Sequence, residues 1–213
     1  MTGNPARYGA VLFDLLTAVI DSWTLWNHVA GDDAVGQRWR ARYLRLTYGA
    51  GSYVPYETLV ARAASDEGLN PALAAKLVAE WDQLRPWPEA RGALDDVRRQ
   101  ARIGVVTNCS DELGARAAAL VGVPFDILVT AESAGAYKPR AAPYQAALAQ
   151  LGLPAQRVLF VAGSPHDIPG AGAIGMPVWW HNRIGMPREH TPAPIAEHRT
   201  LTALPDYLTT NSA

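Results

Sequence analysis

The sequence has a single cysteine, no block of basic residues and no apolar run that approaches the roughly eighteen residues of a membrane-spanning helix. The one cysteine, Cys109, excludes a disulfide within the chain and a cysteine-rich metal site. The formal net charge is −1, and the only arginine-rich stretch, at residues 38–45, is short. The sequence therefore has no extended basic surface of the kind that binds nucleic acid or a membrane. The N-terminal residues lack the pattern of a secretory signal. We therefore expect an untargeted cytoplasmic protein whose partner is a small molecule.

Apolar residues make up 49% of the chain, enough for a sizeable core. Short runs rich in β-branched residues and bounded by Gly, Pro or polar residues predict buried strands at 10–14, 103–108, 125–130, 157–163 and 177–181. Helical patterns lie between the later runs, at 111–121, 141–152 and 167–175. This alternation predicts an α/β fold, a doubly wound, Rossmann-like parallel sheet with helices on both faces.

Residues 20–86 follow a different pattern. Their apolar positions are spaced as in helices, and glycines and prolines divide the segment into about four helices with no convincing strand. We therefore expect an all-helical cap at 20–86, inserted after the first strand of a core domain made of residues 1–19 and 87–213. The tail after about residue 203 is expected to be poorly ordered.

Polar residues stand where the predicted strands end: Asp14, Thr107 with Asn108, Lys138 in a following loop, and Asp167. The carboxyl ends of parallel strands meet at one edge of a sheet, so these side chains are expected to converge there. A lysine between two carboxylates keeps a nucleophilic acid ionised. The alternative interpretation is that each residue only caps a helix or a strand end.

Four segments in this order, "FDLLTAVID", "VVTNCS", "YKPRAAPY" and "FVAGSPHDIPGAGAIGMPVWWHNRIG", resemble the four motifs of the haloacid dehalogenase superfamily. The resemblance implies that Asp14 attacks the substrate covalently and that the helical insertion is the cap of that superfamily. The L-2-haloacid dehalogenase subgroup is the nearest in pattern. "RWRARYLR" places Arg40 on its active-site arginine, with Arg38 and Arg45 as alternates, and "KPRAAPY" retains its Lys138 and Tyr144.

Two departures from the superfamily's phosphatases bear on the reaction. Those enzymes carry an acid two residues after the nucleophile and an extra acid in the fourth motif that holds magnesium, and here these positions are Leu16 and Gly163. Leucine cannot donate a proton to a leaving group. The two remaining carboxylates, Asp14 and Asp167, supply few of the oxygen ligands that magnesium needs. We therefore expect no metal and no cofactor. Displacement of halide from carbon needs only an ionised carboxylate, a cation and water.

The resemblance to the dehalogenase subgroup is incomplete. Its motif-one Tyr, Gly and Thr are here Leu16, Thr17 and Ala18, and its fourth motif is altered at Ala162, Ser164 and His166. These changes imply a divergent member whose substrate differs from 2-chloropropionate. Tyr144, on an Ala-rich helix, and His166, in a loop, also have ordinary structural interpretations as a core residue and an exposed histidine. Cys109 follows Asn108 at a helix start, a place that favours a thiolate, but we interpret it as a packing residue.

The sequence thus predicts a hydrolase that forms a covalent Asp ester, resembling an (S)-2-haloacid dehalogenase and acting on a small 2-haloalkanoic acid. The predicted catalytic residues are Asp14, Lys138, Asp167 and Arg40. The predicted substrate-binding residues are Thr107, Asn108, Leu16, Ser164, Tyr144 and His166. A phosphatase acting on a small phosphate ester and an inactive binding protein of the same fold are the alternatives. The resemblance also suggests a homodimer.

Overall fold

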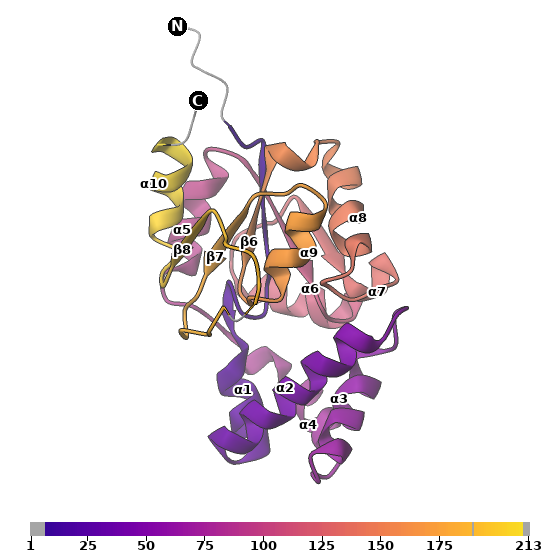
Figure 1. The fold of residues 1–213 in the computed structure, drawn as a ribbon. Coiled ribbons are helices and arrows are strands. Elements are labelled where there is room, and N and C mark those ends of the chain that lie inside the picture. Colours follow the sequence, from indigo (N-terminus) through magenta and orange to yellow (C-terminus); the bar gives the residue numbers. More distant parts are fainter. Residues whose placement is uncertain (1–6, 189, 211–213) are drawn as a thin grey trace, which may run out of the picture.

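The computed structural model describes residues 7–188 and 190–210. An α/β core lies above a layer of helices (Figure 1). The core is a six-stranded parallel sheet in the order β5-β4-β1-β6-β7-β8. The strands are β1 (Ala10–Phe13), β4 (Arg102–Thr107), β5 (Ile127–Thr130), β6 (Val158–Ala162), β7 (Val178–His181) and β8 (Ala196–His198). The expected doubly wound parallel sheet is confirmed.

Both faces of the sheet are covered because successive side chains of a strand point to opposite sides. In β1, Val11 and Phe13 belong to one hydrophobic cluster, whereas Ala10 and Leu12 belong to the other. The first cluster is closed by α5 (Ala90–Arg98), α6 (Asp111–Leu120) and α10 (Ala203–Thr210). The second is closed by α8 (Ala141–Leu151) and α9 (Asp167–Ala173). The short helix α7 (Ala131–Ala134) follows β5 directly.

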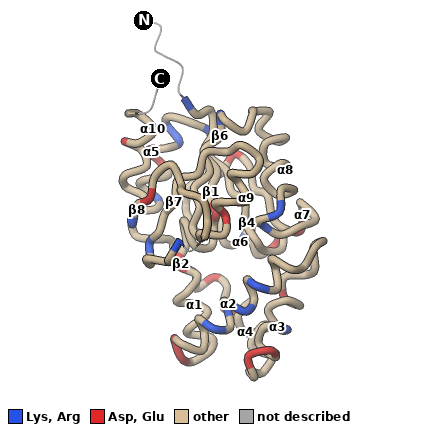
Figure 2. The backbone as a smooth tube through the Cα atoms, viewed as in Figure 1, with Lys and Arg blue, Asp and Glu red and all other residues tan. Residues whose placement is uncertain are grey.

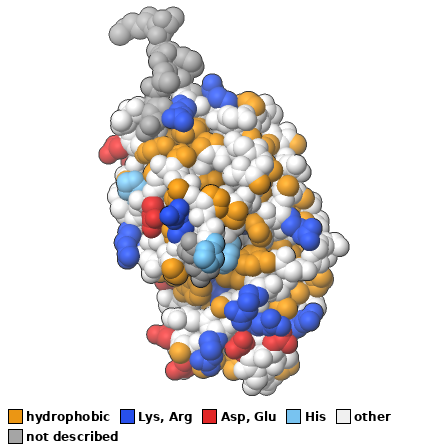
Figure 3. Space-filling model, viewed as in Figure 1, with side chains coloured by type: hydrophobic (Ala, Val, Ile, Leu, Met, Phe, Trp, Pro, Cys, Tyr) orange, Lys and Arg blue, Asp and Glu red, His pale blue; other side chains and the backbone are white. Residues whose placement is uncertain are grey.

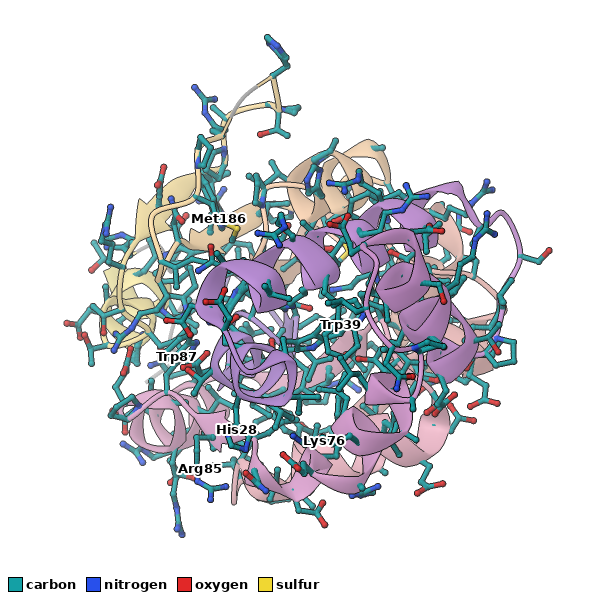
Figure 4. All side chains as sticks on the ribbon, turned by 90° about the horizontal axis from the view of Figure 1, so that it is seen from below. His28, Trp39, Lys76, Arg85, Trp87 and Met186 are labelled. Carbon is teal, nitrogen blue, oxygen red and sulfur yellow. The ribbon has the colours of Figure 1, made fainter. Side chains whose placement is uncertain are left out.

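The helical layer contains α1 (Ser22–Ala30), α2 (Asp33–Gly49), α3 (Tyr56–Asp66), α4 (Leu73–Ala79) and the short 3₁₀ helix η1 (Trp81–Gln83). Its interior is aromatic: the rings of Trp26 and Trp39 lie 4.6 Å apart, and Trp39 Nε1 donates to the Val60 carbonyl at 3.0 Å. Seen from below, Trp39 lies in the middle of these helices (Figure 4). These buried aromatic residues belong to the same hydrophobic cluster as Val11 and Phe13 of β1, so the helical layer packs continuously onto one face of the sheet.

The chain passes between the two layers through a pair of short antiparallel strands, β2 (Ile20–Asp21) and β3 (Arg85–Pro86). Sequence analysis did not predict these strands, since two residues carry no periodicity. The division of the chain into a core of residues 1–19 and 87–213 and a cap of residues 20–86 is supported by this pairing and stays a proposal. Residues 1–6, 189 and 211–213 lie outside the described residues.

The prediction of a poorly ordered tail after residue 203 is wrong for residues 203–210, which form α10. Leu204 and Leu208 are buried in the cluster that also holds Leu94 of α5. Sequence analysis also missed β8, which has only three residues and follows a proline-containing loop. Both elements are short and stabilised by contacts distant in sequence, which local patterns do not reveal. Across the described residues, no helix combines the length and the apolar character needed to cross a membrane.

Candidate active site

The carboxylate of Asp14 lies at the end of β1 and is held by the loop that follows. Asp14 is 7% exposed, and its backbone N–H donates to the Val161 carbonyl at 2.9 Å, which continues the sheet. Its Oδ2 accepts hydrogen bonds from the backbone N–H groups of Thr17 (3.1 Å) and Ala18 (3.2 Å). These two donors fix the orientation of the carboxylate. The strand and the loop therefore present a charged, oriented carboxylate at the edge of the sheet.

Lys138 connects the two buried acids. Its Nζ lies 2.8 Å from Asp14 Oδ1 and 3.3 Å from Asp167 Oδ2, and its side chain is only 2% exposed. Burial alone would lower the pKa of Lys138, but the two carboxylates outweigh it and raise the pKa above the ordinary value. Asn108 holds the lysine's backbone: its Oδ1 accepts from the Lys138 N–H at 2.7 Å and its Nδ2 donates to the Lys138 carbonyl at 3.0 Å. The lysine is thus a charged, fixed bridge.

Asp167 differs from Asp14 in its protonation behaviour. It begins α9 and is 6% exposed, and burial raises its pKa to about 6, although Lys138 opposes this shift. The hydroxyl of Tyr144, itself buried in the core, donates to Asp167 Oδ1 at 3.0 Å. Tyr144 therefore combines both predicted interpretations, since its ring packs in the core and its hydroxyl orients a site carboxylate.

Arg40 on α2 is the arginine of the 38–45 stretch that enters the site. It is 5% exposed, and its Nη2 donates to the Leu16 carbonyl (3.2 Å) and to Thr17 Oγ1 (2.9 Å), both neutral acceptors. Its guanidinium carbon lies 3.8 Å from the ring centre of Trp23, and its Nη1 is buried with no hydrogen-bond partner among the described residues. Burial lowers the pKa of Arg40 to about 10, so it stays charged at neutral pH.

Basic positions recur along α2 (Figure 2), and basic side chains lie on the surface of the helical layer (Figure 3). Arg38 and Arg45 each lie 3.8 Å from a Glu67 oxygen, and Arg42 pairs with Asp66 at 2.6 Å. Their side chains are 32–60% exposed, which is the usual state of arginines on a solvated helix face. Arg38 does not line the pocket, whereas Arg45 does, but Arg45 is largely exposed and lies near an acid, so Arg40 is the better candidate for the site.

A pocket of about 380 Å³ between the core and the helical layer brings most of the predicted residues together. Those that line it are Asp14, Leu16, Arg40, Asn108, Lys138, Ser164, His166 and Asp167, together with the alternate Arg45. Thr107 does not line this pocket: it is fully buried and its hydroxyl lies 3.4 Å from Cys109 Sγ. We therefore leave Thr107 out of the proposed site. Burial raises the pKa of the Cys109 thiol to about 12, which fits a packing role.

Sequence analysis missed much of the apolar lining of this pocket. Leu44 and Tyr48 follow Arg40 at intervals of four residues on α2, and all three line the pocket. That spacing places them on one helix face and would have identified them once Arg40 was chosen. Met186, from the loop after β7, had no signal in the sequence because only the tertiary structure brings that loop beside α2.

A model of the haloacid dehalogenase-like hydrolase family matches residues 11–175, which span the first three motifs, the helical insertion and the first part of the fourth motif. The chain belongs to this family.

Two relatives are similar to this haloacid dehalogenase-like hydrolase over most of its length. Haloacetate dehalogenase H-2 of Moraxella sp. (strain B) is 32% identical over 69% of this chain and 71% of the relative. (S)-2-haloacid dehalogenase 1 of Pseudomonas sp. (strain CBS-3) is 27% identical over 96% of this chain and 97% of the relative. The solved structure of the L-2-haloacid dehalogenase of Xanthobacter autotrophicus with chloropropionic acid covalently bound has the same fold. The TM-score is 0.85 and the sequence identity 19%, and the match covers 97% of this chain and 100% of the solved one.

The residues of this haloacid dehalogenase-like hydrolase do not fit a magnesium ion of the kind that the superfamily's phosphatases hold. A Cβ at Gly163 would lie 2.3 Å from the Ala18 nitrogen and 2.7 Å from Asp14 Oδ2, so the backbone there leaves no room for the missing acid. Leu16 offers the pocket an apolar side chain instead of an oxygen. Magnesium demands near-ideal octahedral oxygen coordination. The described residues contain no group of three or more candidate metal-binding side chains.

Gly163→Ala is expected to lower the activity of the enzyme strongly, because the added methyl group pushes the 14–18 loop away from the Asp14 carboxylate. We expect a loss of 10²-fold or more in kcat/KM, since displacements of about 1 Å at a reacting group have costs of that size. Steady-state kinetics checks this, with Gly172→Ala as the matched control because a Cβ at Gly172 meets nothing within 4 Å. Equal activities of the two variants would contradict the interpretation.

His181, the last residue of β7, supports the same loop from behind. Its ring is fully buried, and Nδ1 donates to the Ala18 carbonyl at 2.7 Å. Burial lowers the pKa of His181, which favours the neutral ring. On the other side, Trp87 Nε1 donates to the Thr17 carbonyl at 2.9 Å. His181 and Trp87 therefore hold the loop whose N–H groups bind Asp14.

Proposed function

We propose that this family member is a metal-independent hydrolase that releases halide from a 2-haloalkanoic acid through an ester on Asp14. The observation that carries the proposal is Arg40, a buried cation with an unpartnered Nη1, in the same pocket as the ionised pair of Asp14 and Lys138. A buried, uncompensated cation is costly unless an anion joins it. The relatives' names support a haloacid as that anion.

The first step is displacement at carbon. One carboxylate oxygen of Asp14 attacks C2 of the acid from the side opposite the halogen, the carbon–halogen bond breaks, and the halide leaves with the bonding electrons. Lys138 keeps the attacking carboxylate ionised, and Arg40 stabilises the substrate carboxylate and the departing halide. A halide leaves without a proton, so Leu16 at the position of the phosphatases' acid is no disadvantage. The product of this step is an ester with inverted configuration at C2.

The second step is hydrolysis of that ester. A water molecule attacks the carboxyl carbon of Asp14, Asp167 accepts its proton, and the bond between that carbon and the substrate oxygen breaks. Asp167 is suited to this task because a general base works best with a pKa near the operating pH, and burial raises its pKa to about 6. The leaving alkoxide takes the proton of the new carboxyl group of Asp14, so the 2-hydroxy acid leaves and the Asp14 carboxylate is regenerated. Asp167 then releases its proton to solvent. An (S)-2-haloacid therefore gives an (R)-2-hydroxy acid.

The deciding experiment measures halide release from (S)-2-chloropropionate and (S)-2-bromopropionate in the presence of a strong chelator. Undiminished release supports the proposal. Activity that disappears with chelator and returns with magnesium, together with turnover of an aryl phosphate, would favour the phosphatase alternative. No covalent adduct on Asp14 with any acid, measured by mass spectrometry, would favour the inactive binding protein. The homodimer and the cytoplasmic location stay predictions.

Arg40→Met is expected to lower kcat/KM for 2-bromopropionate by roughly 10- to 100-fold, because a charge-assisted hydrogen bond in a buried site contributes about 1.5–3 kcal/mol. The matched control is Arg42→Met on the same helix, which removes an outward-facing pair with Asp66 and leaves the kinetics unchanged. Steady-state halide release measures both. A similar loss in the two variants would show that Arg40 acts through helix stability rather than through the substrate.

The pH profile separates the two chemical steps. Asp167 accepts a proton only when ionised, and its pKa is raised to about 6, so steady-state halide release is expected to fall about tenfold per unit as the pH drops below 6. The first-turnover burst, which reports ester formation, persists in that range because it does not use Asp167 as a base. Rapid-quench measurements between pH 5 and 8 test this. A burst that falls in parallel with the steady state contradicts the assignment of Asp167.

A further inference from the structure

The pocket is much larger than the smallest 2-haloacids require. It encloses about 380 Å³, whereas an apolar cavity of about 150 Å³ already holds a benzene molecule. In haloacetate and 2-halopropionate the group on C2 is a hydrogen or a methyl. With such an acid bound at Asp14 and Arg40, most of the pocket remains unfilled by substrate. A site of this size fits a larger group on C2.

The walls of the unfilled part are apolar and largely aromatic. They are formed by Trp23, Trp26, Tyr43, Tyr48, Tyr56, Leu16, Leu44, Ala41, Met186 and Pro187. Neighbouring rings are in contact: Trp26 and Tyr43 lie 5.4 Å apart, and Tyr43 and Tyr56 lie 5.1 Å apart. Aromatic rings prefer such edge-to-face and offset neighbours, so a further ring in this pocket would gain similar contacts.

Two of the three tyrosine hydroxyl groups of this wall have partners inside the protein, whereas the indole N–H of Trp23 has no hydrogen-bond partner among the described residues. Tyr43 donates to the Asn108 carbonyl at 2.8 Å, and Tyr48 forms a side-chain hydrogen bond with Ser164. The tyrosines therefore offer the pocket mainly ring surface. Lys138 joins Asp14 and Asp167 in one cluster, and Arg40 binds the loop that follows Asp14. Arg45 also lines the pocket, but its side chain is 58% exposed. This distribution fits a substrate with a charged head and an apolar body.

Leu16 contributes to the space above the nucleophile. It lies two residues after Asp14 and lines the pocket, half-buried. The resembled subgroup carries a tyrosine there, so leucine removes both a ring and a hydroxyl next to the reacting carbon. The presence of Leu16 instead of that tyrosine therefore enlarges the pocket where the C2 substituent of a substrate would lie.

We propose that the preferred substrates are 2-haloacids whose C2 carries an aryl-substituted group, such as 2-halo-3-phenylpropanoates. This inference rests on the proposed function and specifies its substrate class. The phenyl ring packs against Leu44, Tyr48 and Met186, which are only partly buried in the pocket lining, while the carboxylate and the carbon–halogen bond lie at Arg40 and Asp14.

The test compares bromide release from (S)-2-bromo-3-phenylpropanoate and (S)-2-bromopropionate. We expect kcat/KM to be at least tenfold higher for the phenyl compound, which would be the effect of burying one ring. Release from 2-bromopropionate with an equal or lower value for the phenyl compound overturns this inference and leaves the proposed function intact. No release from either acid overturns the proposed function itself, so the two failures are distinguishable.

Two variants locate the binding site of the ring. Leu44→Trp fills the pocket from α2, and Met186→Trp fills it from the loop after β7; each is expected to reduce the preference for the phenyl compound at least tenfold. Ala75→Trp is the matched control, because it adds the same indole to an exposed position of α4 outside the pocket and leaves the preference unchanged. Using two walls protects the test from one variant that fails to fold. An unchanged preference in both folded variants overturns the placement of the ring.

Discussion

Asp14→Asn abolishes halide release, with an expected loss on the order of 10⁴-fold or more in kcat. The amide is a poor nucleophile, and no other side chain in the pocket is placed to form the ester, so the loss approaches that of nucleophile deletions in other covalent enzymes. Steady-state halide release measures it. Asp33→Asn is the matched control. Asp33 is an exposed residue in the first turn of α2, so this variant is expected to retain full activity.

Oxygen labelling tests directly whether the ester forms on Asp14. In a single turnover with excess enzyme in H₂¹⁸O, the heavy oxygen is expected in the Asp14 carboxylate, because water attacks the carboxyl carbon of the ester. The 2-hydroxy acid then carries an oxygen that came from Asp14. Mass spectrometry of the peptide containing Asp14 and of the product distinguishes the outcomes. Heavy oxygen in the first-turnover product would mean direct attack of water on C2, and the ester mechanism would be wrong.

Lys138→Met is expected to reduce both activity and stability. The variant leaves two buried carboxylates, Asp14 and Asp167, without their shared cation, and the pKa of Asp167 rises further above its value of about 6. Breaking a buried ion pair by removing one partner costs about 3–5 kcal/mol. For a chain of this size we expect Tm to fall by roughly 6–20 °C, together with a loss of halide release at neutral pH.

Thermal unfolding and halide release of Lys138→Met are measured beside Lys76→Met. Lys76 is the only other lysine of the sequence and lies exposed at the edge of the cap (Figure 4). It pairs with Glu80, one helical turn away, at 3.9 Å. Such surface pairs contribute about 0–1 kcal/mol, so the control keeps its Tm and activity. Lowering the pH below 5 protonates carboxylates and partly restores the relative stability of Lys138→Met. A Tm equal to that of Lys76→Met would show that the buried pair does not stabilise the fold.

Much of the core could be predicted because its signals are local. The runs at 10–14, 103–108 and 157–163 are continuous apolar segments, as expected for strands buried on both faces of a parallel sheet. The strand-end positions of Asp14 and Asp167 followed from those runs. By contrast, β8 and α10 are short elements whose stability comes from contacts with residues far away in the sequence, and they were missed.

The role of Arg40 illustrates the limit of sequence analysis at the site. Helical spacing places Arg38 and Arg45, seven residues apart, on one face of α2 and Arg40 on another, but it does not tell which face meets the core. The packing of α2 over the sheet edge buries Arg40 and leaves the others paired with acids at the surface. For Thr107, the sequence placed the residue at the right strand end, and only the packing of β4 showed its hydroxyl against Cys109.

The sequence alone determined the class of fold, the order of the motifs and the absence of an acid at Leu16 and Gly163, because these depend on residue identity and short-range periodicity. Tertiary structure decided the unpartnered state of Arg40 Nη1, the close approach of Gly163 to the Asp14 loop and the size of the aromatic pocket. These properties depend on the distances between segments that are far apart in the chain. Such distances are set by the packing of α2 and the loop after β7 around one end of the sheet.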